Sequence, residues 1–292
     1  MASSSTKTLL IFLYTFIFCA AINDEICITG DDMGDSWHPT WSPDGKRLAF
    51  VSGEDYYATD IWIKALDGGP AINLTNDPDR DYDPVWSPDG KYIAYESSYQ
   101  ASPAIRIVDV ATGEKTYLTD GESSFCEMPC WSPDSQWVAY MKETWTGNDI
   151  VKTCVTDSTT INLTNDDNTN EHPTWSKDGT VLAFEAHGGL GLSFIPAKGG
   201  PAKHLCLIFL DYPNWSPTNA YIIGGGTNLV KYMFCTEALD YITTGNRQYF
   251  NPEESPDGTN IAFDRLGEIW LLHGPSHLIV PSTLGKIKAN YR

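Results

Sequence analysis

Pro84-Val85-Trp86-Ser87-Pro88-Asp89-Gly90 is the clearest copy of a heptapeptide that recurs along this chain of 292 residues. Its last four residues suit a tight turn, because proline fixes φ, aspartate forms local hydrogen bonds and glycine accepts a positive φ. Six copies are present, and their third residues are Trp41, Trp86, Trp131, Trp175, Trp215 and Glu254. The spacing of 39 to 45 residues between them indicates six similar structural units.

Each unit contains four short stretches with the alternation of β-strands. In the first unit the turn is followed by residues 47–51, then by residues 60–63 and 72–75. No convincing long amphipathic helix is present. Four strands in about 40–45 residues are typical of a propeller blade. The sequence therefore predicts an all-β fold, a six-bladed β-propeller of four-stranded antiparallel blades.

The repeat resembles that of the TolB-type propeller family, which reads Pro-x-Trp-Ser-Pro-Asp-Gly-Lys, then Ile-Ala-Phe, Asp-Ile-Tyr and Leu-Thr. The resemblance extends over residues 26–280 and implies the propeller fold. It is also similar to the propeller domains of dipeptidyl-peptidase and prolyl-oligopeptidase enzymes, so it says little about activity. Those enzymes carry their nucleophile on an appended α/β domain. Only 20 residues follow Leu272 and no Gly-x-Ser-x-Gly motif is present, so we expect no such peptidase activity.

The two ends of the chain suggest how the ring closes. Residues 26–31 align with residues 72–77, as a fourth strand without a blade of its own. We expect this N-terminal strand to join the last blade. Residues 277–280 are then a spare strand, which covers the rim, competes for the same edge or pairs with another molecule. Covering the rim is favoured, because an unpaired edge invites self-association.

The N-terminus is typical of a secretory signal peptide, predicted at residues 1–21. Lys7 precedes an apolar run and the small residues Cys19-Ala20-Ala21. An uncleaved anchor is the alternative, although 14 residues are short for a membrane span. We therefore expect a propeller at residues 22–280, a tail at residues 281–292 and no stable membrane insertion. The protein is predicted to be secreted or extracellular, or periplasmic if the source is a Gram-negative bacterium.

Cysteines and glycosylation sequons agree with export. After cleavage six cysteines remain, for which 15 pairings exist, and we expect disulfides or buried thiols rather than a zinc site. They are Cys27, Cys126, Cys130, Cys154, Cys206 and Cys235. The sequons at Asn73 and Asn162 end outer strands, where a glycan can point into solvent. The sequon at Asn214 lies in an innermost strand and is interpreted as a chance match.

Acidic residues give the main functional signal. The net charge of −19 argues against nucleic acid and anionic membranes as partners. The four connections that lead into blades 1 to 4 hold 13 acids and the single basic residue Arg80. These connections share one face with the loops between second and third strands, so we predict an acidic, aromatic binding face. Its predicted residues are Asp31, Asp32, Asp35, Tyr56, Tyr57, Asp77, Asp79, Asp81, Asp83, Trp145, Asp166, Asp167 and Glu171. Solvated turns that use aspartate are the alternative interpretation.

Three classes of function remain open. We favour a non-enzymatic binding or scaffold propeller that recognises a cationic or polar protein, peptide or glycan. A carbohydrate-active lyase or hydrolase, metal-assisted at the channel mouth, is the second, and a structural module of an extracellular assembly is the third.

Two metal hypotheses accompany these classes. His38 and His172 precede the repeat proline on opposite blades. The resemblance implies a metal role for them, since some TolB-like lyases of the pectin pathway use channel histidines on a metal, but a third histidine is missing. Asp77, Asp79, Asp81 and Asp83 alternate in the manner of calcium ligands, although the EF-hand pattern fails. We predict no cofactor, with calcium as the alternative.

Overall fold

The computed structural model describes residues 25–273, except 31–32, 56–57, 99–102, 121–124, 189–190, 206–207, 209 and 244–246. The predicted signal peptide, the spare strand at residues 277–280 and the tail at residues 281–292 lie outside the described residues. So do the predicted binding residues Asp31, Asp32, Tyr56 and Tyr57.

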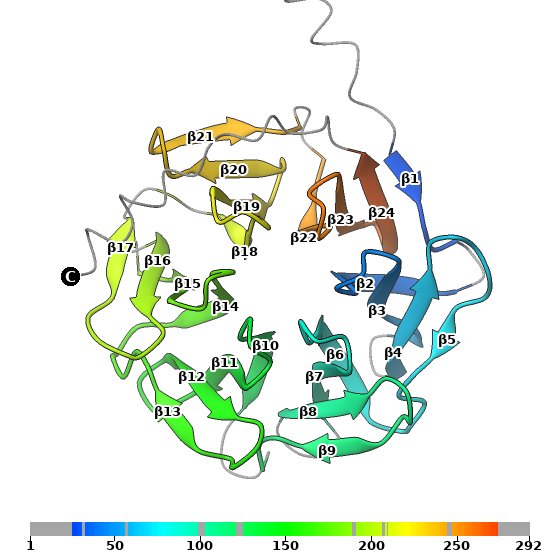
Figure 1. The fold of residues 1–292 in the computed structure, drawn as a ribbon, viewed down its shortest axis with the longest axis horizontal. Helices are drawn as coiled ribbons and strands as arrows, with labels where there is room; N and C mark the ends of the chain where they lie inside the picture. The colour runs from blue at the N-terminus through cyan, green and yellow to red at the C-terminus, as the bar shows by residue number, and fades with distance from the viewer. Residues whose placement is uncertain are drawn as a thin grey trace, which may run out of the picture.

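The described residues form six four-stranded antiparallel sheets arranged as blades around a central axis (Figure 1). Blade 1 contains β2 (Asp35–Trp41), β3 (Arg47–Asp55), β4 (Ala58–Ala65) and β5 (Ile72–Asn73). Blade 2 contains β6 (Arg80–Trp86), β7 (Tyr92–Ser98), β8 (Ala104–Asp109) and β9 (Lys115–Tyr117). Blade 3 contains β10 (Cys126–Trp131), β11 (Trp137–Glu143), β12 (Asn148–Cys154) and β13 (Thr160–Asn162). Blade 4 contains β14 (Asn170–Trp175), β15 (Val181–Ala186), β16 (Gly191–Pro196) and β17 (Lys203–Leu205). Blade 5 contains β18 (Asp211–Trp215), β19 (Tyr221–Gly225), β20 (Val230–Met233) and β21 (Ala238–Tyr241).

Blade 6 confirms the predicted closure of the ring. It contains β22 (Phe250–Glu254), β23 (Asn260–Arg265), β24 (Glu268–His273) and the N-terminal strand β1 (Glu25–Cys27). In β1, Ile26 pairs with Leu271, and the N–H of Ile269 donates to Oγ1 of Thr29 at 2.9 Å. The two ends of the described chain are therefore held in one sheet, and the six-bladed propeller predicted from the repeat is confirmed.

The Ser-Pro-Asp-Gly segments form the predicted turns between first and second strands. In blade 2, Oγ of Ser87 donates to Asp89 at 2.7 Å and accepts from the N–H of Tyr92 at 2.9 Å. Gly90 has a φ of 74°, and Ser135 takes the same left-handed conformation in blade 3. The turn is therefore held by its own side chains, which explains why it can recur in every blade.

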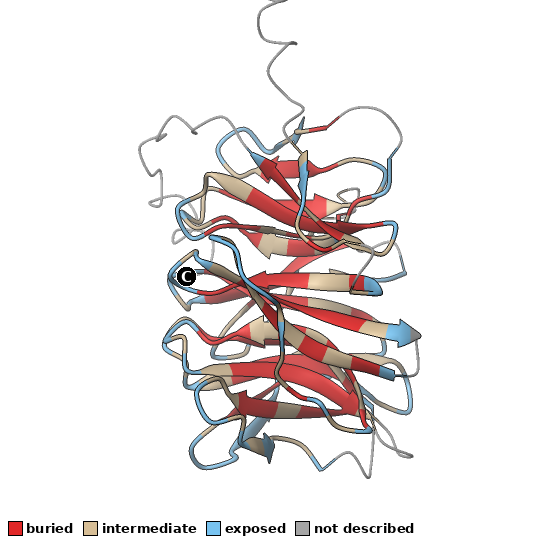
Figure 2. Cartoon of the chain, turned by 90° about the vertical axis from the view of Figure 1, so that its right-hand side faces the viewer, coloured by how far each residue is buried: buried red, intermediate tan, exposed pale blue. Residues whose placement is uncertain are grey.

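The tryptophan of each repeat packs between blades. Trp86 is 4% exposed, and the indole N–H of Trp131 donates to the carbonyl of Val85 in the preceding blade at 3.1 Å. Burial follows the strands, whereas the exposed residues lie mainly at the loops and edges (Figure 2). In blade 6, Glu254 takes the tryptophan position and accepts hydrogen bonds from Tyr221 and Lys231.

The structure also bears on the predicted disulfides and on membrane spans. No disulfide joins any two of the five described cysteines, of which Cys126, Cys130 and Cys154 are buried. Cys206 lies outside the described residues. No helix within the described part of the chain is long and apolar enough to span a bilayer.

Candidate functional site

The residue before the repeat proline has the same unusual backbone in every blade. Its φ is 53° in His38, 49° in Asp83, 56° in Met128, 49° in His172, 55° in Tyr212 and 49° in Asn251. The pairing between first and second strands shifts register at this point in all six blades. Each first strand therefore carries a β-bulge, which re-aims side chains. Because these strands lie nearest the axis (Figure 1), the six residues belong to the wall of the central channel.

His38 connects three neighbouring blades at the channel. Its ring Nδ1 pairs with the carboxylate of Asp83, and its backbone N–H donates to Oδ1 of Asp264 at 3.1 Å. The same Oδ1 accepts from the amide of Asn251 at 2.7 Å. Burial alone would lower the pKa of His38, but the charges of Asp83 and Asp264 raise it above its ordinary value. At neutral pH this histidine is therefore drawn toward its charged form.

His172 has a similar environment on the opposite side of the ring. Its Nδ1 lies 3.1 Å from Oε1 of Glu185, which also accepts from the N–H of Tyr212 at 2.7 Å. The imidazole stands edge-on to the ring of Tyr212, with centroids 4.6 Å apart. Burial opposes a charge on His172, but Glu185 outweighs it and raises the pKa.

Carboxylates outnumber the bases around these histidines. Glu127 and Glu171 lie directly before the bulge residues of blades 3 and 4, and Asp211 does so in blade 5. The second strands contribute Glu96, Glu185 and Asp264 in blades 2, 4 and 6. Together with Asp83 these residues are here called the channel acids, and they are Asp83, Glu96, Glu127, Glu171, Glu185, Asp211 and Asp264.

Burial raises the pKa values of several channel acids, and the charges of neighbouring carboxylates add to the shift. Burial raises the pKa of Glu96 to about 9, and the charges of Asp83 and Glu127 add to this shift, against the opposing effect of Arg80. Burial and the charge of Glu185 raise the pKa of Asp211. Within the described residues, Glu96, Glu127 and Asp211 form no ion pair. The channel mouth therefore holds more carboxyl groups than bases, and a cationic ligand would favour the ionised form of those that burial keeps protonated, such as Glu96.

The predicted binding residues are distributed over three environments. Asp83 and Glu171 are channel acids, and Glu171 accepts from Asn148 and His187 at 3.0 Å each. Asp35 and Asp167 are exposed, and Trp145 is exposed completely.

The remaining predicted aspartates support the loops. Asp77 pairs with Lys115 at 2.6 Å and Asp79 pairs with Arg106 at 2.6 Å. Asp166 accepts from the N–H of Asn168 at 2.9 Å, whereas Asp81 is buried.

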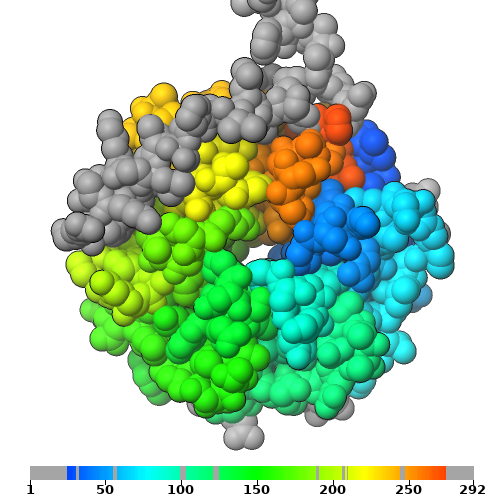
Figure 3. Space-filling view, viewed as in Figure 1, coloured from blue at the N-terminus to red at the C-terminus, as the bar shows by residue number. Residues whose placement is uncertain are grey.

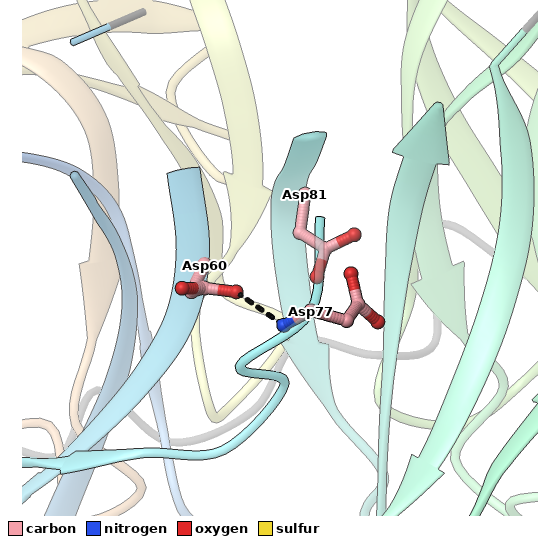
Figure 4. Close-up of side chains that lie close together, drawn as sticks. All are labelled: Asp60, Asp77 and Asp81. Carbon is pink, nitrogen blue, oxygen red and sulfur yellow. Dashed lines mark hydrogen bonds between the residues drawn. The ribbon is translucent and has the colours of Figure 1, made fainter. Parts of the chain in front are cut away.

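Sequence reasoning missed four of the channel acids, Glu96, Glu185, Asp211 and Asp264, as well as Asp60, and it counted Glu127 among the 13 loop acids without naming it as a binding residue. A signal was present, because Glu96, Glu185 and Asp264 each come two residues after the alanine that follows the repeat turn. Among the described residues, the one group of three potential metal ligands close enough to share an ion is Asp60, Asp77 and Asp81 (Figure 4). His38 and His172 do not belong to it.

At both predicted glycosylation sites, the side-chain nitrogen that would carry the glycan donates a hydrogen bond to an aspartate. Nδ2 of Asn73 donates to Asp60 at 2.8 Å, and Nδ2 of Asn162 donates to Asp149 at 2.7 Å. A substituted amide keeps one N–H, so this contact and a glycan are compatible in principle.

Comparison with known proteins places this geometry in a family. The family model of the TolB β-propeller domain matches residues 24–219, and no curated protein matches the chain. TolB from Acinetobacter baumannii is similar in structure, with a TM-score of 0.58 and 19% identity over 82% of this chain and 55% of that one. This chain thus spans about half the length of that TolB.

Two solved enzymes share the fold at lower identity. An oligogalacturonate lyase in complex with manganese has a TM-score of 0.64 and 12% identity over 88% of this chain and 94% of that one. A gluconolactonase from Xanthomonas campestris has a TM-score of 0.69 and 12% identity over 89% of this chain and 92% of that one. Such identities establish the fold alone, whereas the family model covers most of the sequence. The chain therefore belongs to the TolB β-propeller domain family.

Proposed function

We propose that this protein is a non-enzymatic binding propeller that takes up a positively charged, extended peptide segment of a protein partner at its acidic channel mouth. The observation that carries the proposal is the excess of acids there, seven channel acids against Arg80 and three histidines, His38, His172 and His187. The raised pKa values of Glu96 and Asp211, caused mainly by burial, support it, because a cation beside these carboxyl groups stabilises their ionised form.

A peptide fits this site better than a compact ligand does. The acids come from five of the six blades, so they surround an axis rather than line one wall. Figure 3 shows a hollow at the centre of the ring on the face in view. A narrow acidic channel favours a chain that enters end-on with lysine or arginine side chains, which pair well with carboxylates.

The surrounding face provides steering and an anchor. The net charge of −19 attracts a basic partner over long distance. Trp145, which is 105% exposed, and Phe125, at 42%, are large apolar side chains presented by the loops of blade 3. Aromatic side chains of this kind often carry much of the binding energy at protein interfaces.

Binding of labelled peptides tests the proposal. Peptides of equal length that contain arginine, glutamine or glutamate are titrated with the protein, and fluorescence anisotropy reports the affinity. We expect the arginine peptide alone to bind, with an affinity that falls as salt is added. Glu127→Gln should weaken it at least tenfold, whereas Asp167→Asn, an equal loss of charge at an exposed site, should change it less than twofold. Equal effects of the two substitutions would contradict a channel site.

The enzymatic and structural alternatives give different results. Turnover of oligogalacturonides with dependence on His38 and His172 would replace the binding proposal by a lyase. Self-association that disappears when residues 277–280 are removed would favour a structural module.

We further propose that the chain is exported and that residues 1–21 are removed. N-terminal sequencing of protein recovered from the medium or periplasm should then begin at residue 22.

A further inference from the structure

Three aspartates meet where blade 1 packs against blade 2, outside the channel. Asp60 lies on β4, Asp77 in the connection from β5 to β6, and Asp81 on β6. One carboxylate oxygen of each lies within 4.8 Å of the other two. Figure 4 shows the three side chains grouped beside the backbone N–H of Asp77, which donates to Asp60 at 3.3 Å.

Asp81 is the unusual member of this group. It is 0% exposed, and no donor among the described residues has hydrogen-bond geometry to either of its carboxylate oxygens, although the hydroxyls of Ser97 and Thr75 lie nearby. Oγ of Ser97, its cross-strand partner, and the hydroxyl of Tyr95 are likewise buried, and within the described part of the chain neither forms a hydrogen bond of acceptable geometry. A buried carboxylate without donors is costly, so these atoms indicate that a cationic ligand belongs here.

The balance of charge points the same way. Asp60, Asp77, Asp79 and Asp81 bring four negative charges to this junction. Arg106 and Lys115 bring two positive charges, and they pair with Asp79 and Asp77 at 2.6 Å each. When Asp81 is ionised, two negative charges remain, which is the charge that one divalent cation neutralises.

The connection that leads into blade 4 has the same loop but lacks a buried carboxylate at the position of Asp81. It serves as an internal comparison. Asp149 and Asp166 correspond to Asp60 and Asp77, but Asn170 takes the place of Asp81 and its amide donates to Asp166 at 2.9 Å. Phe184 and Ala186 replace Tyr95 and Ser97. The loop therefore folds with an amide at this position, so its geometry does not require the third carboxylate of blade 2.

We propose that Asp60, Asp77 and Asp81 bind a divalent cation, calcium, at the junction of blades 1 and 2. The ligands are all oxygens, which excludes a preference for zinc or copper. Calcium accepts irregular carboxylate sets more readily than magnesium, which demands a near-ideal octahedron. The bound ion would fix the start of β6, and it acts independently of the peptide site.

The experiment uses the mature chain, freed of metal by a chelator. Native mass spectrometry counts bound ions, isothermal titration calorimetry with calcium chloride measures affinity, and thermal denaturation measures stability. We expect one calcium ion per chain and a melting temperature that rises by about 5 °C or more at a hundredfold excess over Kd. Asp81→Asn, which copies residue 170, should fold and weaken calcium binding at least 100-fold. Asp167→Asn, with the same change of charge, should leave binding unchanged.

Two results would overturn the proposal. The first is a wild-type protein that binds no calcium at millimolar concentration, because Asp81 would then be neutralised by a proton. The second is calcium binding that Asp81→Asn does not weaken. If Asp81→Asn does not fold, Asp81→Ser replaces it, since Ser36 stands at this position in blade 1. A wild-type chain that binds no calcium overturns the proposal even without either variant.

Discussion

Replacement of Lys231 by methionine should destabilise the junction of blades 5 and 6 strongly. Glu254 occupies the position that tryptophan fills in the other five repeats. Its Oε1 lies 3.0 Å from Nζ of Lys231, and the two side chains are 1% and 4% exposed. The hydroxyl of Tyr221 donates to Glu254 at 2.7 Å and accepts from Lys231 at 2.8 Å. Lys231→Met keeps the length of the side chain and removes the charge that compensates Glu254.

The expected loss follows from that burial. Removal of one partner from a buried ion pair costs about 3–5 kcal/mol, because the other charge stays in a medium of low dielectric constant. A loss of 3 kcal/mol corresponds to a fall of about 6–12 °C in melting temperature for a domain near this size. The control is Lys152→Met, at the same repeat position in blade 3. Lys152 lies over the ring of Trp137, with Nζ 4.4 Å from its centroid, and donates to the carbonyl of Ala197 at 2.7 Å. It makes no ion pair within the described residues, so its loss should cost about 1–2 kcal/mol.

A double replacement separates loss of charge from loss of packing. Lys231→Ile with Glu254→Trp restores the residue types of blade 2, where Ile107 and Trp86 stand at these positions. The new indole should donate to the carbonyl of Asn214, as that of Trp215 does to Thr174 at 3.2 Å. We expect the double variant to regain most of the stability that Lys231→Met loses. Urea denaturation followed by circular dichroism measures each free energy. The reasoning is refuted if Lys231→Met lies within 1 kcal/mol of the wild type or is no less stable than Lys152→Met.

Three further predictions follow from the same structure. Burial raises the pKa of Glu96 to about 9 and of Glu253 to about 7, so the folded chain binds more protons than the unfolded one above pH 4.5. His38 and His172, whose pKa values are also raised, act in the same direction. With a chelator present, the free energy of unfolding measured by urea denaturation should therefore fall by at least about 1 kcal/mol between pH 5.5 and 9. A rise over this range would contradict these assignments. A chain that begins at residue 30 lacks β1 and exposes the edge of β24, so light scattering should detect self-association that the full chain does not show. Enzymatic deglycosylation of protein from a glycosylating secretory host should convert Asn73 and Asn162 to aspartate but leave Asn214, and peptide mass mapping that finds Asn73 and Asn162 unmodified would exclude these sites.

The fold was predictable because its determinants are local and repeated. The turn at residues 87–90 is held by hydrogen bonds among its own side chains, and the alignment of residues 26–31 with a fourth strand identified the closure of the ring. Glu254 could be recognised as an exception to the repeat, but its partner Lys231 could not. That pairing depends on which residues of blade 5 face blade 6, and the spacing of residues in the sequence does not predict which ones do.

The candidate site was predictable only as a face. In a regular strand Asp81 and Asp83 would point to the same side, which is why the sequence suggested a common set of calcium ligands for Asp77, Asp79, Asp81 and Asp83. The bulge at Asp83, with its φ of 49°, directs this side chain to His38 in the channel, and Asp79 pairs with Arg106 instead. Asp60, from another strand, takes their place beside Asp77 and Asp81. The irregular backbone at Asp83 thus places its carboxylate in the channel, whereas the carboxylate of Asp81 lies at the junction of blades 1 and 2. The alternation of aspartates in the sequence does not predict this separation.

Differences between the blades distinguish residues required by the fold from residues available for binding. The serine of the turn is present in all six repeats, so it serves the architecture. The position of Glu96, Glu185 and Asp264 holds Val51, Met141 and Gly225 in the other three blades, which form the same sheets. An acid there is not needed to build a blade, and a buried carboxylate costs stability, as the pKa of Glu96 shows. Its occurrence in every second blade places carboxyl groups evenly around the axis. Glu185 and Asp264 also accept hydrogen bonds from the backbone N–H groups of Tyr212 and His38 in the next blade. Glu96, in contrast, forms no ion pair within the described residues, so it is the acid of this set that a cationic ligand on the axis would benefit most.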